Sequence, residues 1–266
     1  MSWSRVSTLL RCPRHFDLRY RKRIPAVVPV EDPGALEAGK LVHRILELSV
    51  KRCASFGYTL EGSGYAEIWR AFVGNSLSPD MQRRMAALYA PSAEVLQRVV
   101  DLAGKFRAEV STERRLMLNR AWKYAESCSW EQMAWLGYVD LEMIASGKAL
   151  IIDYKSEYFS QDRSEKVAVQ TAMYAYAEFR RKYSIQQVQT GCAYLMDGKI
   201  TMATTLFRDD IPMLEERLRS FYEKYLSRLA SGTTKPEASM YCQWCGYMQD
   251  CPVCKERING TEKEKD

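Results

Sequence analysis

Apolar residues recur every three to four positions in several long stretches of the chain, which is the spacing of one buried helix face. Shorter runs that are rich in β-branched and aromatic residues lie between these stretches and favour strands. The expected helices cover residues 4–12, 36–56, 66–109, 164–183 and 210–231, and the expected strands cover residues 115–122, 135–145, 148–154, 188–196 and 199–207. Strands enclosed by helices predict a mixed α/β fold.

Short polar dipeptides indicate how the strands are joined. Ser146-Gly147 separates the second and third expected strands and Asp197-Gly198 separates the last two, so each pair is expected to form a hairpin. Ser4 and Asp210 stand before the first and last expected helices, where a side-chain oxygen can accept a hydrogen bond from an unpaired backbone N–H. Ser164 is expected to begin the helix that follows the first hairpin.

Prolines and glycines are expected to interrupt the helices. Pro13 and Pro91 lack the N–H that an internal helical residue donates, and the stretch 74–79 contains both glycine and proline. Residues 24–34 contain three prolines and predict an irregular connector. The parts expected within one domain over residues 1–258 are a basic arm at 1–30, a helical insertion at 60–110, a catalytic core at 111–210 and a cysteine segment at 236–256, followed by a charged tail at 259–266.

The composition narrows the class of protein. Of the 266 residues, 47% are hydrophobic and 27% are charged, which excludes a disordered or fibrous chain and suffices for a core without disulfides. No apolar run approaches the ~20 residues that span a bilayer, and the first residues lack the apolar stretch of a secretory leader. We therefore expect a cytoplasmic protein without a membrane segment, whose cysteines stay reduced unless a metal binds them.

Positive charge is concentrated at the start of the chain. Residues 1–24 hold seven basic residues and one acid, with aromatic residues between them, while the net charge of the whole chain is +6. Such an arm can contact the phosphates and bases of a nucleic acid, or it can be a solvated helix face. The candidate DNA-binding residues are Arg11, Arg14, Arg19 and Arg21.

The first expected hairpin carries charged side chains where its apolar runs end. Asp153 and Lys155 are two residues apart on one strand and point to the same face, and Asp140 on the neighbouring strand can lie across from them. Two close carboxylates repel each other unless a cation joins them, and an incomplete set of oxygen ligands suits Mg²⁺ or Mn²⁺. Such a site can hydrolyse phosphodiester bonds, with Lys155 orienting water or stabilising charge. An isolated Asp-x-Lys is more often a surface ion pair.

Eight cysteines are present, and four of them are close together near the end of the chain. Cys53, Cys128 and Cys192 stand alone in apolar surroundings and are expected to be core thiols. A metal or cluster site, rather than disulfides, is predicted for the segment 242–254, whose sequence is CQWCGYMQDCPVC. Two Cys-x-x-Cys pairs would suit zinc, and an iron–sulfur cluster is the other candidate.

Several short motifs occur together in one order. Gly137-Tyr-Val-Asp140 precedes Asp153-Tyr-Lys155-Ser156, Gly39-Lys-Leu-Val-His43 lies upstream, and Gln170-Thr-Ala-Met-Tyr174 follows. Over residues 2–254 this set resembles the RecB-like branch of the PD-(D/E)XK nuclease superfamily, which includes the nuclease domains of RecB and AddB and the CRISPR-associated RecB-like exonucleases. Ile152 stands where the name of the superfamily places a proline.

The resemblance implies a restriction-endonuclease-like mixed sheet flanked by helices, with a helical insertion. The implied ligands of the divalent metal are His43, Asp140 and Asp153. The implied catalytic residues are Asp153, Lys155, Gln170 and Tyr174, with Glu113 in a supporting role. Gln170 and Tyr174 are four residues apart on one helix face, so they could bond phosphate oxygens or steady Lys155.

Relatives in this branch hold a [4Fe–4S] cluster with one cysteine near the start of the chain and three near its end. The implied ligands are Cys12, Cys242, Cys245 and Cys251, which leaves Cys254 spare. The cluster would be an iron–sulfur staple that joins the two terminal segments and brings the basic arm beside the catalytic hairpin. Closing so long a loop could add up to roughly 5 kcal/mol of stability, and zinc is the alternative occupant.

The function implied by the resemblance is a metal-dependent DNA exonuclease that acts on single-stranded ends, 5′ to 3′, in recombination, repair or CRISPR-type processing. No Gly-x-x-x-x-Gly-Lys-[Ser/Thr] motif is present, so any helicase would be a separate partner. One alternative is a non-catalytic DNA-end-binding subunit of a recombination or CRISPR adaptation complex. Another is a zinc-binding scaffold whose acids are surface charges.

Overall fold

The computed structural model describes residues 2–26, 33–56, 58–74, 77–129, 131–159, 161–239, 242 and 245–253, apart from the side chains of residues 3, 33, 54 and 161–169. The chain forms two compact units. The terminal unit consists of Met1–Pro33 and Glu216–Asp266, and the core unit consists of Gly34–Glu215. In the described part of the chain, no helix is long and apolar enough to cross a membrane.

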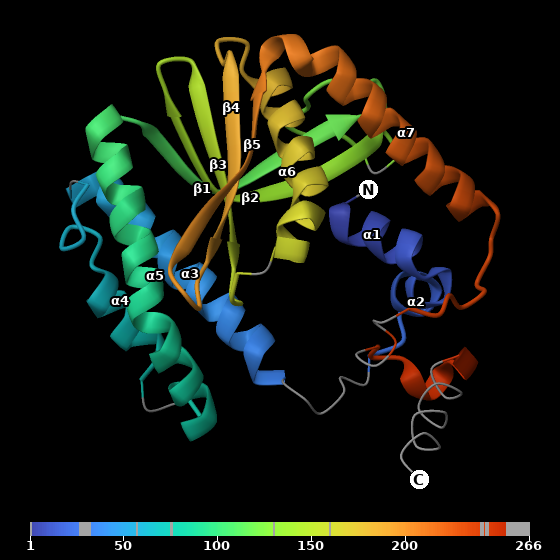
Figure 1. Cartoon of the computed structure of the whole chain (residues 1–266), viewed down its shortest axis with the longest axis horizontal. Helices are drawn as coiled ribbons and strands as arrows, with labels where there is room; N and C mark the ends of the chain where they lie inside the picture. Colours follow the sequence, from blue (N-terminus) through green and yellow to red (C-terminus); the bar gives the residue numbers. More distant parts are fainter. Residues whose placement is uncertain are drawn as a thin grey trace. The chain divides into compact units, whose positions relative to one another are not determined.

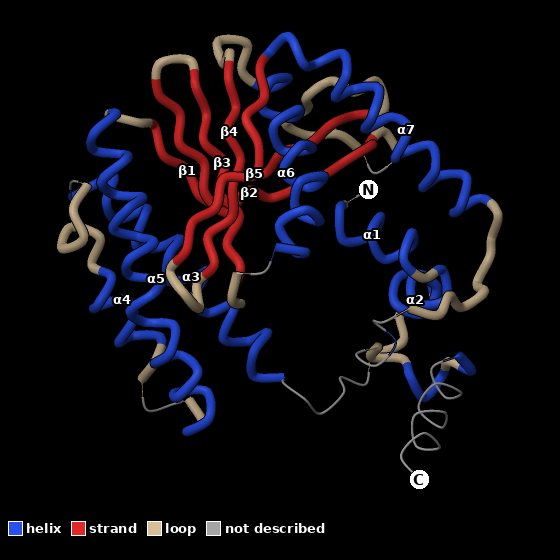
Figure 2. Tube along the Cα trace, viewed as in Figure 1, coloured by secondary structure: helices blue, strands red, loops and turns tan. Residues whose placement is uncertain are grey.

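The core unit contains a five-stranded mixed sheet in which the strands follow one another in chain order (Figures 1 and 2). The strands are β1 (Glu109–Asn119), β2 (Met133–Ala145), β3 (Lys148–Lys155), β4 (Gln187–Tyr194) and β5 (Lys199–Phe207). Only β3 and β4 are parallel, and α6 (Gln161–Arg181) connects them. The expected mixed α/β sheet flanked by helices is confirmed.

Both predicted hairpins form. Ser146 and Gly147 have φ angles of 48° and 74° and join β2 to β3 directly after the pair Ala145 and Lys148, as the dipeptide predicts. The connection between β4 and β5 is longer than expected. The strand β4 ends at Tyr194, so four residues rather than the two of Asp197-Gly198 form the turn.

Helices α3 (Pro33–Phe56), α4 (Tyr65–Phe72) and α5 (Pro79–Phe106) cover one side of the sheet, and α6 covers the other (Figure 2). Residues that form the core between α3, α5 and the sheet are Val42, Ile45, Leu46, Met85, Leu96, Val99, Leu141, Ile152 and Tyr154. The apolar spacing that predicts these helices therefore marks their buried faces. This packing holds α3 and α6 against the strands that carry the candidate acids.

Several predicted boundaries are wrong. Pro91 does not end a helix, because α5 continues through it; the hydroxyls of Ser92 and Tyr65 donate to nearby carbonyls of this turn. Strand β1 begins at Glu109 rather than at residue 115, and α6 begins at Gln161 rather than at Ser164. The break expected at 74–79 is present between α4 and α5.

The terminal unit combines the start of the chain with the residues that follow Glu215. Its described helices are α1 (Trp3–Arg11), α2 (Pro13–Phe16), a π-helical turn η1 (Asp17–Arg21), the last part of α7 (Ile211–Ala230) and a 3-10 helix η4 (Met248–Asp250). Ser2 rather than Ser4 occupies the N-cap position of α1, and Pro13 begins α2. Asp210 directly precedes α7 as expected. Cys254 and the charged tail lie outside the described residues.

Candidate active site and cysteine pocket

The candidate acids lie where β2 and β3 separate. The last pair between these strands is Leu141 with Ile152, so Asp140 and Asp153 stand just beyond it, on adjacent strands. The Oδ2 atom of Asp140 accepts a hydrogen bond of 2.7 Å from the backbone N–H of Tyr154. The carboxylate of Asp140 therefore accepts a backbone hydrogen bond from β3 just beyond the last pair of the two strands. Asp140 and Asp153 lie close together, as the sequence predicts.

Lys155 and α6 provide the contacts of Asp153. The Lys155 Nζ atom lies 2.5 Å from Asp153 Oδ2, as expected for residues i and i+2 of a strand. Gln170 Nε2 donates to Asp153 Oδ1 at 3.0 Å and is 2.8 Å from the hydroxyl of Tyr174. The amide of Gln170 contacts the carboxylate that pairs with Lys155, so any effect of Gln170 on Lys155 would act through Asp153.

Gly137 allows α6 to approach the strand at this position. A Cβ atom built at Gly137 would lie 2.6 Å from the Tyr174 ring and 2.5 Å from Trp135, closer than real contacts permit. The rings of Trp135 and Tyr174 meet edge to face with centroids 5.7 Å apart. The glycine three residues before Asp140 therefore makes room for the rings of Trp135 and Tyr174.

His43 reaches the site from α3. Its Nδ1 atom is 3.7 Å from Asp140 Oδ1, and its ring meets the Tyr154 ring edge on. Burial lowers the pKa of His43, but the hydrogen bond and charge of Asp140 outweigh burial and raise it overall. One turn earlier, a Cβ at Gly39 would lie 2.5 Å from Ser156 Oγ, so α3 passes close to the end of β3 at this glycine.

The electrostatics of the site favour a bound cation. Burial, joined by the charge of Asp140, raises the pKa of Asp153 even though Lys155 and His43 oppose the shift. The charge of Asp153 outweighs burial and raises the pKa of Lys155, which keeps its positive charge. Two carboxylates in a buried site thus share one lysine, and an added cation would relieve their repulsion.

Glu113 lies beside the same acids. The register of β1 and β2 runs from Thr112–Leu141 to Arg114–Val139, which places Glu113 across from Asp140. Its φ angle of 50° is left-handed, an unusual conformation for a strand residue with a side chain. Burial and the charges of Asp140 and Glu47 raise its pKa.

The donors at this site fit Mg²⁺ or Mn²⁺. Two carboxylates and one histidine are available, and Mg²⁺ commonly takes only one or two protein carboxylates and keeps several waters. Among the residues that the structure describes, no three His, Cys, Asp or Glu side chains are already arranged to hold an ion by themselves. Water or substrate oxygens would complete the coordination.

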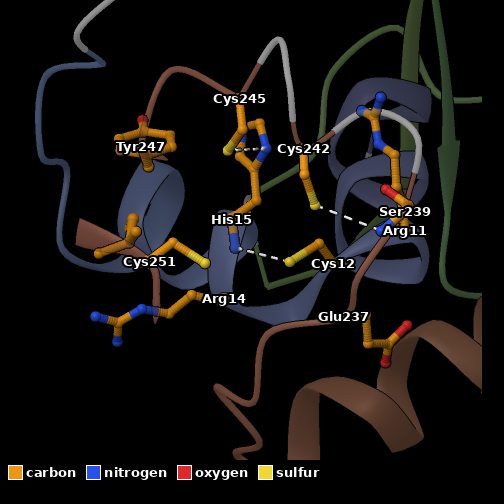
Figure 3. A pocket seen from close by; sticks show the side chains of 11 residues that line it. Arg11, Cys12, Arg14, His15, Glu237, Ser239, Cys242, Cys245, Tyr247 and Cys251 are labelled. Carbon is orange, nitrogen blue, oxygen red and sulfur yellow. Dashed lines mark hydrogen bonds between the residues drawn. The ribbon is translucent and has the colours of Figure 1, made fainter. Parts of the chain in front are cut away.

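The terminal unit contains a cysteine pocket, a cavity of about 110 Å³ (Figure 3). The residues that line it are Arg11, Cys12, Arg14, His15, Leu18, Glu237, Ser239, Cys242, Cys245, Tyr247 and Cys251. Burial raises the pKa of the Cys245 thiol, and the three other cysteines raise it further because they lie close to it. Cys12 and three cysteines from the end of the chain thus line one cavity.

Backbone N–H groups point at two of these sulfurs. Ser239 N–H is 3.4 Å from Cys242 Sγ, and His15 N–H is 3.5 Å from Cys12 Sγ. Such donors stabilise thiolates, so the cysteine pocket fits an iron–sulfur cluster or zinc. The sequence interpretation missed His15, although it is one of only two histidines and follows Cys12 by three residues.

The other isolated cysteines are not all core thiols. Cys53 and Cys192 are buried, whereas Cys128 is only half-buried. Cys192 pairs with Asp153 across β3 and β4, and burial raises the pKa of its thiol to about 12.

The arginines proposed to bind DNA also contact the terminal unit itself. Arg14 donates to the carbonyl of Asp250 at 3.3 Å, and Arg21 donates to the carbonyl of Leu229 at 2.8 Å. Arg19 stacks on Tyr20, and Arg11 lines the cysteine pocket. Part of this basic arm is therefore structural.

Comparison with known proteins shows which family and which solved structures this chain is similar to. The family model of the PD-(D/E)XK nuclease superfamily matches residues 1–252. A candidate exonuclease from Eubacterium rectale shares 11% identity and a TM-score of 0.50, with 96% of this chain and 87% of that chain covered. The structure of SSO0001 covers 95% of this chain and 86% of its own, at 14% identity and a TM-score of 0.36. No curated protein matches. At 11% identity, the Eubacterium rectale structure supports the fold alone.

Proposed function

Because the chain belongs to the PD-(D/E)XK nuclease superfamily, we propose that it is a divalent-metal-dependent exonuclease that hydrolyses DNA at single-stranded ends, 5′ to 3′. The observation that carries this proposal is the meeting of Asp140, Asp153 and Lys155 where β2 and β3 separate. Nucleases of this superfamily generally use metals such as Mg²⁺. Recombination, repair or CRISPR-type processing are the pathways in which such an activity would serve.

Each residue of the site has a role in this proposal. Asp140, Asp153 and His43 would hold Mg²⁺ or Mn²⁺, which polarises phosphate oxygens and makes bound water more acidic. Lys155 holds its proton and stabilises the negative charge that develops on the phosphate. Gln170 and Tyr174 orient Asp153 through the amide hydrogen bond.

The cysteine pocket completes the proposal with a structural cofactor. Cys12, Cys242, Cys245 and Cys251 would hold a [4Fe–4S] cluster that staples the two ends of the chain within the terminal unit. Zinc is the other occupant that four thiolates suit. A cytoplasmic location, where thiols remain reduced, agrees with either group.

Substrate contacts would come from the basic arm. Arg11, Arg14, Arg19 and Arg21 would contact DNA phosphates, and Arg19 and Arg21 are exposed. A helicase or other recombination or CRISPR proteins would be separate partners.

A time course on labelled oligonucleotides tests the activity. We expect Mg²⁺ or Mn²⁺ to support release of short products from a 5′-labelled single strand, while a circular single strand and an EDTA-treated reaction remain uncut. Cleavage of the circle would show an endonuclease, and early release from the 3′-labelled end would reverse the polarity. Absence of any cleavage by metal-loaded protein that binds the strand would favour the non-catalytic DNA-end-binding subunit.

A further inference from the structure

His15 contacts two sulfurs of the cysteine pocket. Its backbone N–H donates to Cys12 Sγ at 3.5 Å, and its ring Nδ1 lies 3.9 Å from Cys245 Sγ (Figure 3). Cys12 comes from the start of the chain and Cys245 from its end. One residue therefore connects sulfurs from both segments that make the pocket.

Packing holds the imidazole in this orientation. The ring meets Tyr247 edge to face, with centroids 5.1 Å apart and an angle of 72° between the planes. Tyr247 is buried, and its hydroxyl donates to the carbonyl of Ile24 at 3.1 Å. Since Tyr247 is anchored in this way, the ring of His15 has a fixed aromatic neighbour.

We propose that His15 is a positioning residue of the cluster, in which Nδ1–H donates a hydrogen bond to the sulfur of Cys245. This inference rests on the proposed [4Fe–4S] cofactor of the cysteine pocket. A donor to a ligand sulfur withdraws charge from it and favours the reduced cluster, whose negative charge is larger. His15 thus makes the cluster easier to reduce and slows the loss of the cluster from the protein.

Ligation by His15 is a different arrangement that the geometry does not favour. Four cysteines already line the cavity, and the dashed line in Figure 3 joins Nδ1 to the Cys245 sulfur. A hydrogen bond uses this contact without displacing a thiolate. Nδ1 carries the proton in this tautomer, which leaves Nε2 without one.

Two substitutions separate the donor from the bulk of the ring. His15→Phe keeps a ring against Tyr247 but removes the N–H, whereas His15→Asn keeps an amide N–H near the position of Nδ1. After anaerobic purification, we expect both variants to bind iron and sulfide as the wild type does. We expect a more negative reduction potential and faster bleaching in air for His15→Phe only. His43→Phe is the matched control, and its cluster should behave as that of the wild type.

The results distinguish the inference from the cofactor on which it rests. Equal potentials for wild type and His15→Phe, or equal shifts for His15→Phe and His15→Asn, would overturn the role of His15 and leave the cluster in place. Zinc, or no metal, in the wild type would overturn both.

A measurement without substitution at residue 15 covers the case in which His15→Phe does not fold. The chain has two histidines, so in ¹⁵N-histidine-labelled His43→Phe protein only residue 15 carries the label. Pulsed EPR of the reduced cluster should show one weak nitrogen coupling, as a hydrogen-bonded ring gives. Absence of a coupling, or a strong one from direct iron ligation, would overturn the inference.

Discussion

The candidate active site of the core unit and the cysteine pocket of the terminal unit each contain one histidine, and the pKa values of the two histidines are shifted in opposite directions. The pKa of His43 is raised because Asp140 outweighs burial. The pKa of His15 is lowered to about 4 by burial and by the charges of Arg11 and Arg19. The field around His43 is negative, which suits a divalent cation, whereas the field around His15 is positive, which suits a group built from thiolates.

The ligand atoms show the same difference. Asp140 and Asp153 offer hard oxygens at the ends of two strands, as Mg²⁺ and Mn²⁺ prefer. The cysteine pocket offers soft sulfurs, as structural zinc and iron–sulfur sites do. If both proposed sites bind metal, their unlike chemistry predicts that either metal can be removed without direct loss of the other.

Removal of Asp153 should produce the largest effect. Asp153→Ala deletes one of two candidate carboxylate ligands and the partner of Lys155, so we expect cleavage to fall by about three orders of magnitude or more. The rate of release from an end-labelled single strand measures this loss. Iron content and single-strand binding, measured on the same preparation, should stay close to wild type.

The exposed Asp101 of α5 supplies the matched control, because Asp101→Ala removes a carboxylate of the same unit away from the site. Its cleavage rate should equal that of the wild type. Loss of iron in Asp153→Ala would contradict the separation of the two metal sites, and retained cleavage would contradict the role of Asp153.

Substitution in the cysteine pocket should have the opposite effect to Asp153→Ala, with loss of the metal bound in the pocket. Cys242→Ala removes one of four thiols that line the cavity, and we expect loss of the bound metal and about 3–5 kcal/mol of stability. Metal analysis and urea unfolding measure the two effects. Cys128→Ala, at a half-buried isolated cysteine, should keep both properties. If Cys242→Ala kept its metal and its midpoint, the staple would be wrong.

Local sequence patterns predict the helices, the strands and the pair of acids, because each of these depends on residues that are close together in the sequence. Asp153 and Lys155 meet because strand side chains alternate, and Ser146-Gly147 forms the turn that brings Asp140 near. Contacts across the fold could not be read in this way. Whether the Gln170 amide contacts Asp153 or Lys155 depends on how α6 packs near Gly137.

Other misses have the same origin in tertiary structure. Pro91 was expected to end a helix on propensity, but packing of α5 and nearby polar side chains sustain the helix around it. His15 lacked any sequence signal beyond its distance from Cys12, because its partner Cys245 is 230 residues away. The four cysteines proposed as cluster ligands are predicted from the family resemblance, because the spacing of cysteines along the chain does not link Cys12 to the other three.

A second pair of acids in the core unit sharpens the contrast with Asp140 and Asp153. Glu142 on β2 pairs with Arg114 at 2.6 Å and with Arg181 at 3.3 Å, and Arg181 also pairs with Glu178. Two arginines therefore form ion pairs with these two acids, whereas a single lysine pairs with an acid at the candidate site. Arginines supply at Glu142 and Glu178 the positive charge that a metal would supply at the site.

This buried pair predicts a pH effect of intermediate size. Burial, with a contribution from Glu142, raises the pKa of Glu178 to about 7. A carboxyl whose pKa is higher in the folded state stabilises the fold below about pH 4.5 and loses that contribution as pH rises through about 7. Glu178→Gln should therefore gain on the order of 2 kcal/mol relative to wild type between pH 5 and pH 8. Urea unfolding at a series of pH values measures the gain.

Glu126→Gln, at an exposed residue of the same unit, is the control and should follow the wild type at each pH. Parallel stability curves for Glu178→Gln and the wild type would show that Glu178 is ionised throughout this range. Iron content should be unchanged in either variant.

The smallest effect is expected at Tyr174. Tyr174→Phe removes the hydroxyl 2.8 Å from Gln170 Nε2 but keeps the ring against Trp135, so the Gln170 amide loses one partner while its bond to Asp153 remains. A neutral hydrogen bond contributes about 0.5–1.5 kcal/mol, which predicts a rate reduced by about two- to tenfold. Single-turnover cleavage measures it, with Tyr183→Phe, at an exposed tyrosine, as the control. A loss as large as that of Asp153→Ala would make the hydroxyl itself a catalytic group, and no loss would limit Tyr174 to packing against Gly137.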